Sequence, residues 1–143
     1  EIKIPENMEE IKAFGENRLN DQAFNELYQM GLHYLETQEF VKAKSLFFFL
    51  TSIEPTSYDC WYGFGCSLKG NQEPQMAIDA FCYAVVSNPN HPAPRFQLID
   101  LFFQTGDLEG ALAEFLVAKQ LIEENEEWNA FLPFLKKYES LTN

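Results

Sequence analysis

The chain has 143 residues, of which 46% are apolar and 15% aromatic, so it is long enough and apolar enough to form one compact domain with a substantial core. Its 22 acidic and 10 basic residues give a formal net charge of −12. This charge argues against binding to nucleic acid or to an anionic membrane surface. A solvated acidic surface is the simplest interpretation, and a basic or apolar partner is compatible with it.

The three cysteines, Cys60, Cys66 and Cys82, indicate a reducing compartment. An odd count without a CxxC motif argues against a disulfide framework or a zinc site. We expect reduced thiols that behave as small hydrophobes. No apolar run approaches the roughly 18 residues of a membrane span. We expect a cytoplasmic protein without a signal peptide, although the sequence starts at Glu1 rather than Met.

Residues 1–22 are polar with sparse apolar side chains, and they predict a short helix or an ordered arm. Gly15 weakens the helical pattern in its middle. The apolar residues of this arm need a surface, either on this chain or on a second copy. The candidate dimer contacts are Met8, Ile11 and Phe14.

Three units recur along the rest of the chain, centred on the stretch from Trp61 to Pro89. Ala77 has alanines 34 residues before and after it, and Phe81 has phenylalanines at the same offsets. This spacing resembles the tetratricopeptide repeat. The units are 24–57, 58–91 and 92–125. The third departs from the pattern, with Arg95 and Ile99 at the positions of Trp61 and Gly65, as terminal repeats often do.

The spacing of apolar residues predicts two helices in each unit and a further helix after the last unit. Asp21 is the expected cap of the first helix, and Pro133 predicts a kink or a late start in the closing helix. We expect a single all-α domain over 1–143, in which the closing helix 126–143 covers the third unit. The predicted helices are 21–37, 40–52, 58–69, 74–87, 93–104 and 108–123.

The first helix of each unit carries an apolar stripe that is expected to face the core. In the first unit this core stripe is Leu27, Met30, Gly31 and Tyr34. Gly31, Gly65 and the repeated alanines are expected where the two helices of a unit approach closely. A larger side chain there overpacks the core, at about 1–3 kcal/mol.

A second stripe runs about 100° further round each first helix. In tetratricopeptide proteins, which form right-handed superhelices, the first helices line the concave side, so the resemblance implies that this stripe lies in a groove. Most of its residues are large and apolar, which predicts a binding surface. The alternative is that the N-terminal arm or the closing helix covers it. This groove stripe is Tyr28, Leu32, Leu35, Tyr62, Cys66, Lys69, Phe96, Asp100 and Phe103.

The groove stripe indicates the chemistry of a ligand. Aromatic and aliphatic walls suit Leu, Pro or Ile side chains of an extended peptide, and the Tyr28 and Tyr62 hydroxyls can bond a peptide backbone. Lys69 and Asp100 are expected to orient polar groups. An extended, proline-containing segment loses little entropy when it docks.

The chain also resembles the class II chaperones of type III secretion, which serve pore-forming translocator proteins. The resemblance covers about residues 8–140. It rests on Leu27-Tyr28 with Gly31, on Trp61 to Gly65, on Ala77 to Ala84, and on the proline-rich connector from Asn88 to Phe96. The number of repeats, the N-terminal arm and the acidic composition are also similar.

This resemblance implies a bacterial cytoplasmic chaperone that keeps a hydrophobic translocator soluble until export. Its groove takes an extended client segment of PxLxxP type, and members of the family often dimerise through the N-terminal region. The matching pocket positions are Tyr28, Leu32, Leu35, Tyr62 and Phe96. Departures at 97–100 and at Lys69-Gly70 bear on client identity and on the far end of the groove.

Two other classes of protein fit the sequence less well. A generic tetratricopeptide adaptor or scaffold subunit is the alternative, but Tyr28 and Leu32 stand where an adaptor for heat-shock chaperone tails needs Lys and Asn. An enzyme is disfavoured because His33 and His91 lack a Cys or Ser partner at useful spacing, and because no P-loop, paired-carboxylate or metal-ligand motif occurs. We therefore expect no catalysis, cofactor or metal.

Overall fold

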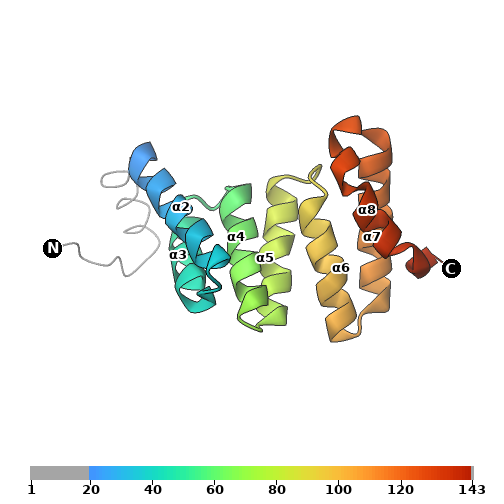
Figure 1. Ribbon diagram of the computed structural model, residues 1–143, viewed down its shortest axis with the longest axis horizontal. Coiled ribbons are helices and arrows are strands. Elements are labelled where there is room, and N and C mark those ends of the chain that lie inside the picture. The colour runs from blue at the N-terminus through green and yellow to red at the C-terminus, as the bar shows by residue number, and fades with distance from the viewer. Residues whose placement is uncertain (1–19, 143) are drawn as a thin grey trace.

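The computed structural model describes residues 20–142, and within this range the chain is entirely helical (Figure 1). Successive helices run back and forth and stack side by side from α2 at one end to α7 and α8 at the other. The predicted all-α class and the helix-pair fold are confirmed. The elements are α2 (Asp21–Glu36), α3 (Phe40–Ile53), α4 (Tyr58–Gly70), α5 (Pro74–Ser87), α6 (Ala93–Thr105), α7 (Leu108–Glu124), η1 (Glu126–Phe131), α8 (Leu132–Lys137) and η2 (Glu139–Thr142).

Short polar side chains cap the starts of α2, α4 and α7, and a glycine ends α6. The cap of α2 is Asn20, not Asp21 as predicted: the Asn20 side chain accepts a hydrogen bond from the backbone N–H of Ala23 at 2.8 Å. The Asp107 side chain accepts in the same way from the N–H of Gly110 at 2.8 Å. Gly106 ends α6 with φ of 83°, a left-handed conformation that glycine adopts without strain.

Buried residues of the core recur at the spacing of the predicted repeats. Phe47, Phe81 and Phe115 are at most 1% exposed, although they lie on three different helices. Side chains would not fit where two glycines approach these rings: a Cβ atom on Gly31 would lie 2.7 Å from Phe47, and one on Gly65 would lie 2.7 Å from Phe81. The repeated alanines Ala43, Ala77 and Ala111 are fully buried.

The first unit is less enclosed than the sequence predicts. Met30, expected in the core, is 47% exposed, and its neighbours Leu27 and Tyr34 are only partly buried. The corresponding stripe of the second unit is better covered, because Phe64 and Leu68 are buried between neighbouring helices. The difference follows from position, since α2 is the first described helix of the stack (Figure 1).

The end of the chain forms three short pieces rather than one helix. The 3-10 helix η1 leads into α8, and η2 follows it. Pro133 lies in the first turn of α8, where its missing N–H breaks no hydrogen bond, so the predicted late start is confirmed. We call residues 126–142 the C-terminal segment; Figure 1 shows it beside α6 and α7, at the opposite end of the molecule from α2.

The candidate dimer contacts Met8, Ile11 and Phe14 lie outside the described residues. The predicted boundary of the arm at residue 22 differs slightly from the start of α2 at Asp21.

Candidate functional site

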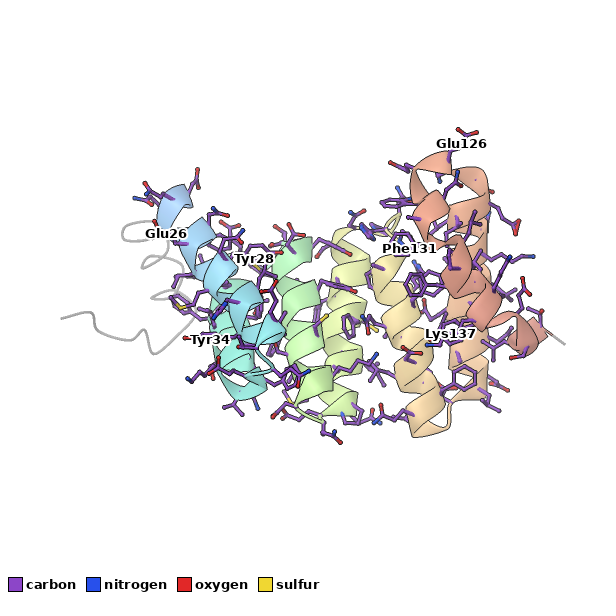
Figure 2. The ribbon with its side chains drawn as sticks, in the orientation of Figure 1. Glu26, Tyr28, Tyr34, Glu126, Phe131 and Lys137 are labelled. Atoms are coloured by element: carbon purple, nitrogen blue, oxygen red, sulfur yellow. The ribbon has the colours of Figure 1, made fainter. Side chains whose placement is uncertain are left out.

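The groove stripe of the first two units lies on α2 and α4. Tyr28, Leu32 and Leu35 on α2 are partly buried and pack against the core, as do Tyr62 and Cys66 on α4. The Tyr28 ring meets Phe47 edge-on, with 6.0 Å between ring centroids, and Tyr62 meets Phe81 edge-on at 5.4 Å. These side chains therefore have fixed positions, with one face against the core and the remainder open. Figure 2 shows Tyr28 and Tyr34 on α2, at the N-terminal end of the stack of helices.

The exposure of this stripe is lower than the sequence predicts. None of these five residues is among the exposed large apolar side chains, and in the whole stripe only Phe103 is, at 40% exposure. A partly buried apolar wall still presents surface to a ligand, and its fixed rings lose little entropy on binding.

Burial moves the pKa values of the hydroxyls and the thiol of this wall further above neutral. It raises the pKa of Tyr62 to about 12 and that of the Cys66 thiol to about 11. It also raises the pKa of Tyr28, with the Asp59 carboxylate acting in the same direction. At neutral pH the stripe therefore offers neutral hydroxyls and a thiol that is a poor nucleophile. Such a wall has the chemistry to accommodate an apolar segment and to donate hydrogen bonds to its backbone.

The third unit places its part of the stripe differently. Phe96, predicted to line the ligand pockets, is only 7% exposed. Its ring stacks on Phe131 with 6.0 Å between centroids and an interplanar angle of 2°, and it contacts Phe134 at 5.5 Å. The C-terminal segment thus covers Phe96 (Figure 2, Phe131 labelled), as in the alternative in which the closing helix covers the stripe, and the role of Phe96 in a ligand pocket stays a prediction.

Lys69 and Asp100 are also engaged within the chain. Lys69 Nζ donates to Gln97 Oε1 at 2.7 Å and lies 3.3 Å from Asp100 Oδ2. Gln97 Nε2 donates to the Tyr62 hydroxyl at 3.1 Å, and the Tyr138 hydroxyl donates to Asp100 Oδ1. These side chains connect α4 and α6 with Tyr138, the residue that follows α8. The role of Lys69 and Asp100 in orienting ligand groups stays a prediction.

The most exposed apolar side chains lie on the second helix of each unit, where the sequence analysis placed no site. The sequences of α3 and α5 are apolar on most of their circumference, and this signal could have predicted an apolar outer surface. The exposed residues are Val41, Phe48, Met76, Tyr83, Val86, Leu108, Leu116 and Val117.

His91 has a structural environment. Its ring lies 5.0 Å from that of Tyr58 and 4.6 Å from that of Trp128, measured between centroids. Its Nδ1 accepts a hydrogen bond from the N–H of Ala93 at 3.1 Å, and burial lowers its pKa. His91 thus joins the connector before α6 to the second unit and to the C-terminal segment.

Over residues 20–142 no three His, Cys, Asp or Glu side chains gather in a way that could hold a metal ion. The helices described there are all too short or too polar to cross a membrane.

Comparison with known proteins identifies the fold. No protein-family model matches the chain, and no curated protein is detectably similar in sequence. Solved structures do match. SycD of Yersinia enterocolitica, a type III secretion chaperone in complex with a peptide of the translocator YopD, is 18% identical, with a TM-score of 0.81 over 88% of this chain and 97% of that one.

Two further structures agree. PcrH of Pseudomonas aeruginosa, in complex with the chaperone binding region of PopD, is 21% identical, with a TM-score of 0.82 over 87% of this chain and 95% of that one. A type III secretion complex from Aeromonas hydrophila is 20% identical, with a TM-score of 0.83 over 90% and 87% of the two chains. The chain therefore has the fold of the type III secretion translocator chaperones.

Proposed function

We propose that this protein is a cytoplasmic bacterial chaperone of type III secretion that binds hydrophobic translocator proteins and keeps them soluble before export. It binds an extended client segment, of PxLxxP type, along the groove stripe of α2 and α4. Its role is binding rather than catalysis, without a cofactor or metal. A homodimer formed through the N-terminal region is part of this proposal, with Met8, Ile11 and Phe14 as the contacts.

The partly buried apolar wall formed by α2 and α4 is the observation that carries this proposal. Tyr28, Leu32 and Leu35 continue along the stack into Tyr62 and Cys66, and all five pack against one core cluster. Neutral hydroxyls next to apolar surface match a peptide backbone with apolar side chains. Structures with this fold have been solved with translocator segments bound.

The charge of the chain supports the same class of partner. A net charge of −12 keeps the chaperone soluble while an apolar client is attached, and it disfavours nucleic acid. A generic adaptor with another peptide ligand is the alternative, and the two proposals differ in the client rather than in the groove.

Co-expression tests the proposal. A translocator encoded beside the gene for this chain should be soluble and co-purify with it, and should precipitate when expressed alone. The double variant Tyr28→Ala/Tyr62→Ala should weaken binding by about tenfold or more, since buried aromatic anchors are typical hot spots. Binding is measured by calorimetry with a synthetic peptide of the translocator's PxLxxP segment, on variants whose helicity and melting temperature match the parent.

The outer surface supplies a matched control. Val41 is 62% and Val86 76% exposed, so Val41→Ala/Val86→Ala also removes two exposed apolar side chains. This control should bind like the parent. Unchanged binding in the tyrosine variant would contradict the groove assignment. A translocator that stays soluble without the chain would contradict the chaperone role and leave the adaptor.

A further inference from the structure

The far third of the groove stripe is already filled by the chain itself. Rings of the C-terminal segment lie on the two aromatic members of the stripe in α6: Phe131 and Phe134 contact Phe96, and Tyr138 lies 6.1 Å from Phe103 between centroids. Tyr138 also contacts Phe96 at 6.3 Å. The segment therefore occupies the place where a ligand of the third unit would lie.

This packing belongs to the hydrophobic core. Leu135 is 7% and Tyr138 6% exposed, and both belong to one buried cluster with Phe115 and Ile122 of α7. Displacing the segment would expose these residues and leave one side of Phe96 without a neighbour. The cost of that exposure favours a segment that stays in place when a ligand binds.

The polar residues at this point form a boundary. Asp100 accepts from Tyr138 on one side and pairs with Lys69 on the other, and Lys69 in turn donates to Gln97. A ligand backbone that continued past Lys69 would have to replace these bonds. On the other side of the boundary, Tyr28, Leu32 and Leu35 have no equivalent cover from the C-terminal segment.

We infer that the C-terminal segment determines where the ligand site ends, and that Phe131 and Tyr138 are specificity-determining residues that exclude the client from the third unit. The inference rests on the proposed function and adds to it: the client is read by α2 and α4, and its bound segment ends beside Lys69. Clients are thereby selected for a short apolar segment rather than one that spans all three units.

Site-specific photo-crosslinking of the full chain tests this, with the translocator of the co-expression experiment as the probe. Benzoylphenylalanine replaces Phe103 in one protein and Leu32 in another. With the probe present, the group at 32 should crosslink to the translocator. The group at 103 should crosslink to residues 126–142 of its own chain, equally with and without the probe.

A second variant opens the boundary. Tyr138→Ala removes the ring over Phe103 and the bond to Asp100, and in this background the group at 103 should begin to crosslink to the translocator. Amide hydrogen exchange provides a readout in the unaltered chain: the probe should slow exchange in α2 and α4 and leave exchange in 126–142 unchanged.

The outcomes separate the two claims. Translocator crosslinks at both 32 and 103 in the parent, or faster exchange in 126–142 on binding, overturn the inference and leave the proposed function standing. No self-crosslink at 103 in the free chain overturns it as well. Absence of translocator crosslinks at both positions overturns the proposed groove and this inference with it.

Discussion

Helices α4 and α6 occupy equivalent places in successive units, and their stripes have different surroundings. Tyr62 of α4 and Phe96 of α6 are 34 residues apart, yet Tyr62 is partly open while Phe96 is 7% exposed. The two stripes have different neighbours. The stripe of α4 lies beside the edge of α6, whereas the aromatic C-terminal segment covers the stripe of α6. The same repeat position is therefore a candidate ligand wall in one unit and part of the core in the next.

The two regions also differ in charge and polarity. The exposed end of the groove contains neutral hydroxyls, and the closed end contains the ion pair of Lys69 and Asp100, joined to Tyr138. Burial, with the adjoining Asp100 carboxylate, raises the pKa of Tyr138 above its ordinary value, so this hydroxyl remains a donor. The closed end is thus held by polar bonds as well as by ring packing.

The largest expected effect is the loss of free energy of unfolding when a buried phenylalanine is removed. It tests whether the second and third units depend equally on their cores. Phe81 and Phe115 are both at most 1% exposed, so Phe81→Ala and Phe115→Ala should each lower the free energy of unfolding by about 3–5 kcal/mol. Urea denaturation measures this. Phe48→Ala is the control, because Phe48 is 61% exposed, and it should cost much less. A small loss in Phe115→Ala alone would mean that the third unit is only loosely packed.

A smaller effect is expected where the helices of the second unit meet. Ala77 is fully buried, and Ala77→Leu should destabilise the domain by about 1–3 kcal/mol through overpacking. The melting temperature measures this, and Met76→Leu, at a neighbouring exposed position, is the control. An unchanged melting temperature in Ala77→Leu would contradict the repeat register.

The polar boundary is expected to contribute less than the cores. Tyr138→Phe keeps the ring and removes the hydroxyl that donates to Asp100, which should cost about 1–2 kcal/mol, since one partner is charged. Tyr62→Phe removes the acceptor for Gln97 and the hydrogen bond between the Tyr62 hydroxyl and the Cys66 thiol, and because both partners are neutral it should cost about 1 kcal/mol. Urea midpoints of the two variants can be compared directly. The reverse order would show that the boundary is held by ring packing rather than by its hydrogen bonds.

The smallest effect concerns pH. Burial lowers the pKa of His91 in the folded state below its ordinary value of 6.5, so folding favours the neutral ring whose Nδ1 accepts from Ala93. The contribution of His91 to the free energy of unfolding is complete at pH values above its ordinary pKa. It declines as the pH falls toward the folded-state pKa, with a slope of no more than about 1.4 kcal/mol per pH unit. Nearby Asp59 and Glu127 oppose the shift.

Substitution isolates this contribution from the titrating carboxylates. The stability difference between the parent and His91→Gln should shrink between pH 7.5 and pH 5.5, as measured by urea denaturation at each pH. Met76→Leu, an exposed substitution that changes no titratable group, is the control and should keep a constant difference from the parent. A constant difference for His91→Gln would rule out the proposed dependence on the neutral ring.

The sequence by itself determined the repeat register and nearly every helix end. Alanine, phenylalanine and glycine recur at a fixed spacing because close helix approach and ring packing restrict which side chains fit there, as the contact of Gly65 with Phe81 illustrates. Pro74 and Pro133 lie in first turns of helices. Proline lacks a backbone N–H, and only in the later turns of a helix does that N–H donate a hydrogen bond within the helix. Local chemistry decides these features, so they can be read from neighbouring residues.

Only the tertiary structure decided which part of the groove stripe is open. Nothing near Phe96 in sequence indicates that Phe131 and Phe134 cover it, and the ion pair of Lys69 with Asp100 joins residues from different units. Met30 is exposed for a similar reason, since its burial depends on a neighbour and not on its helical position. Burial is a property of the contacts between distant segments, whereas periodicity records only which face of a helix a residue occupies.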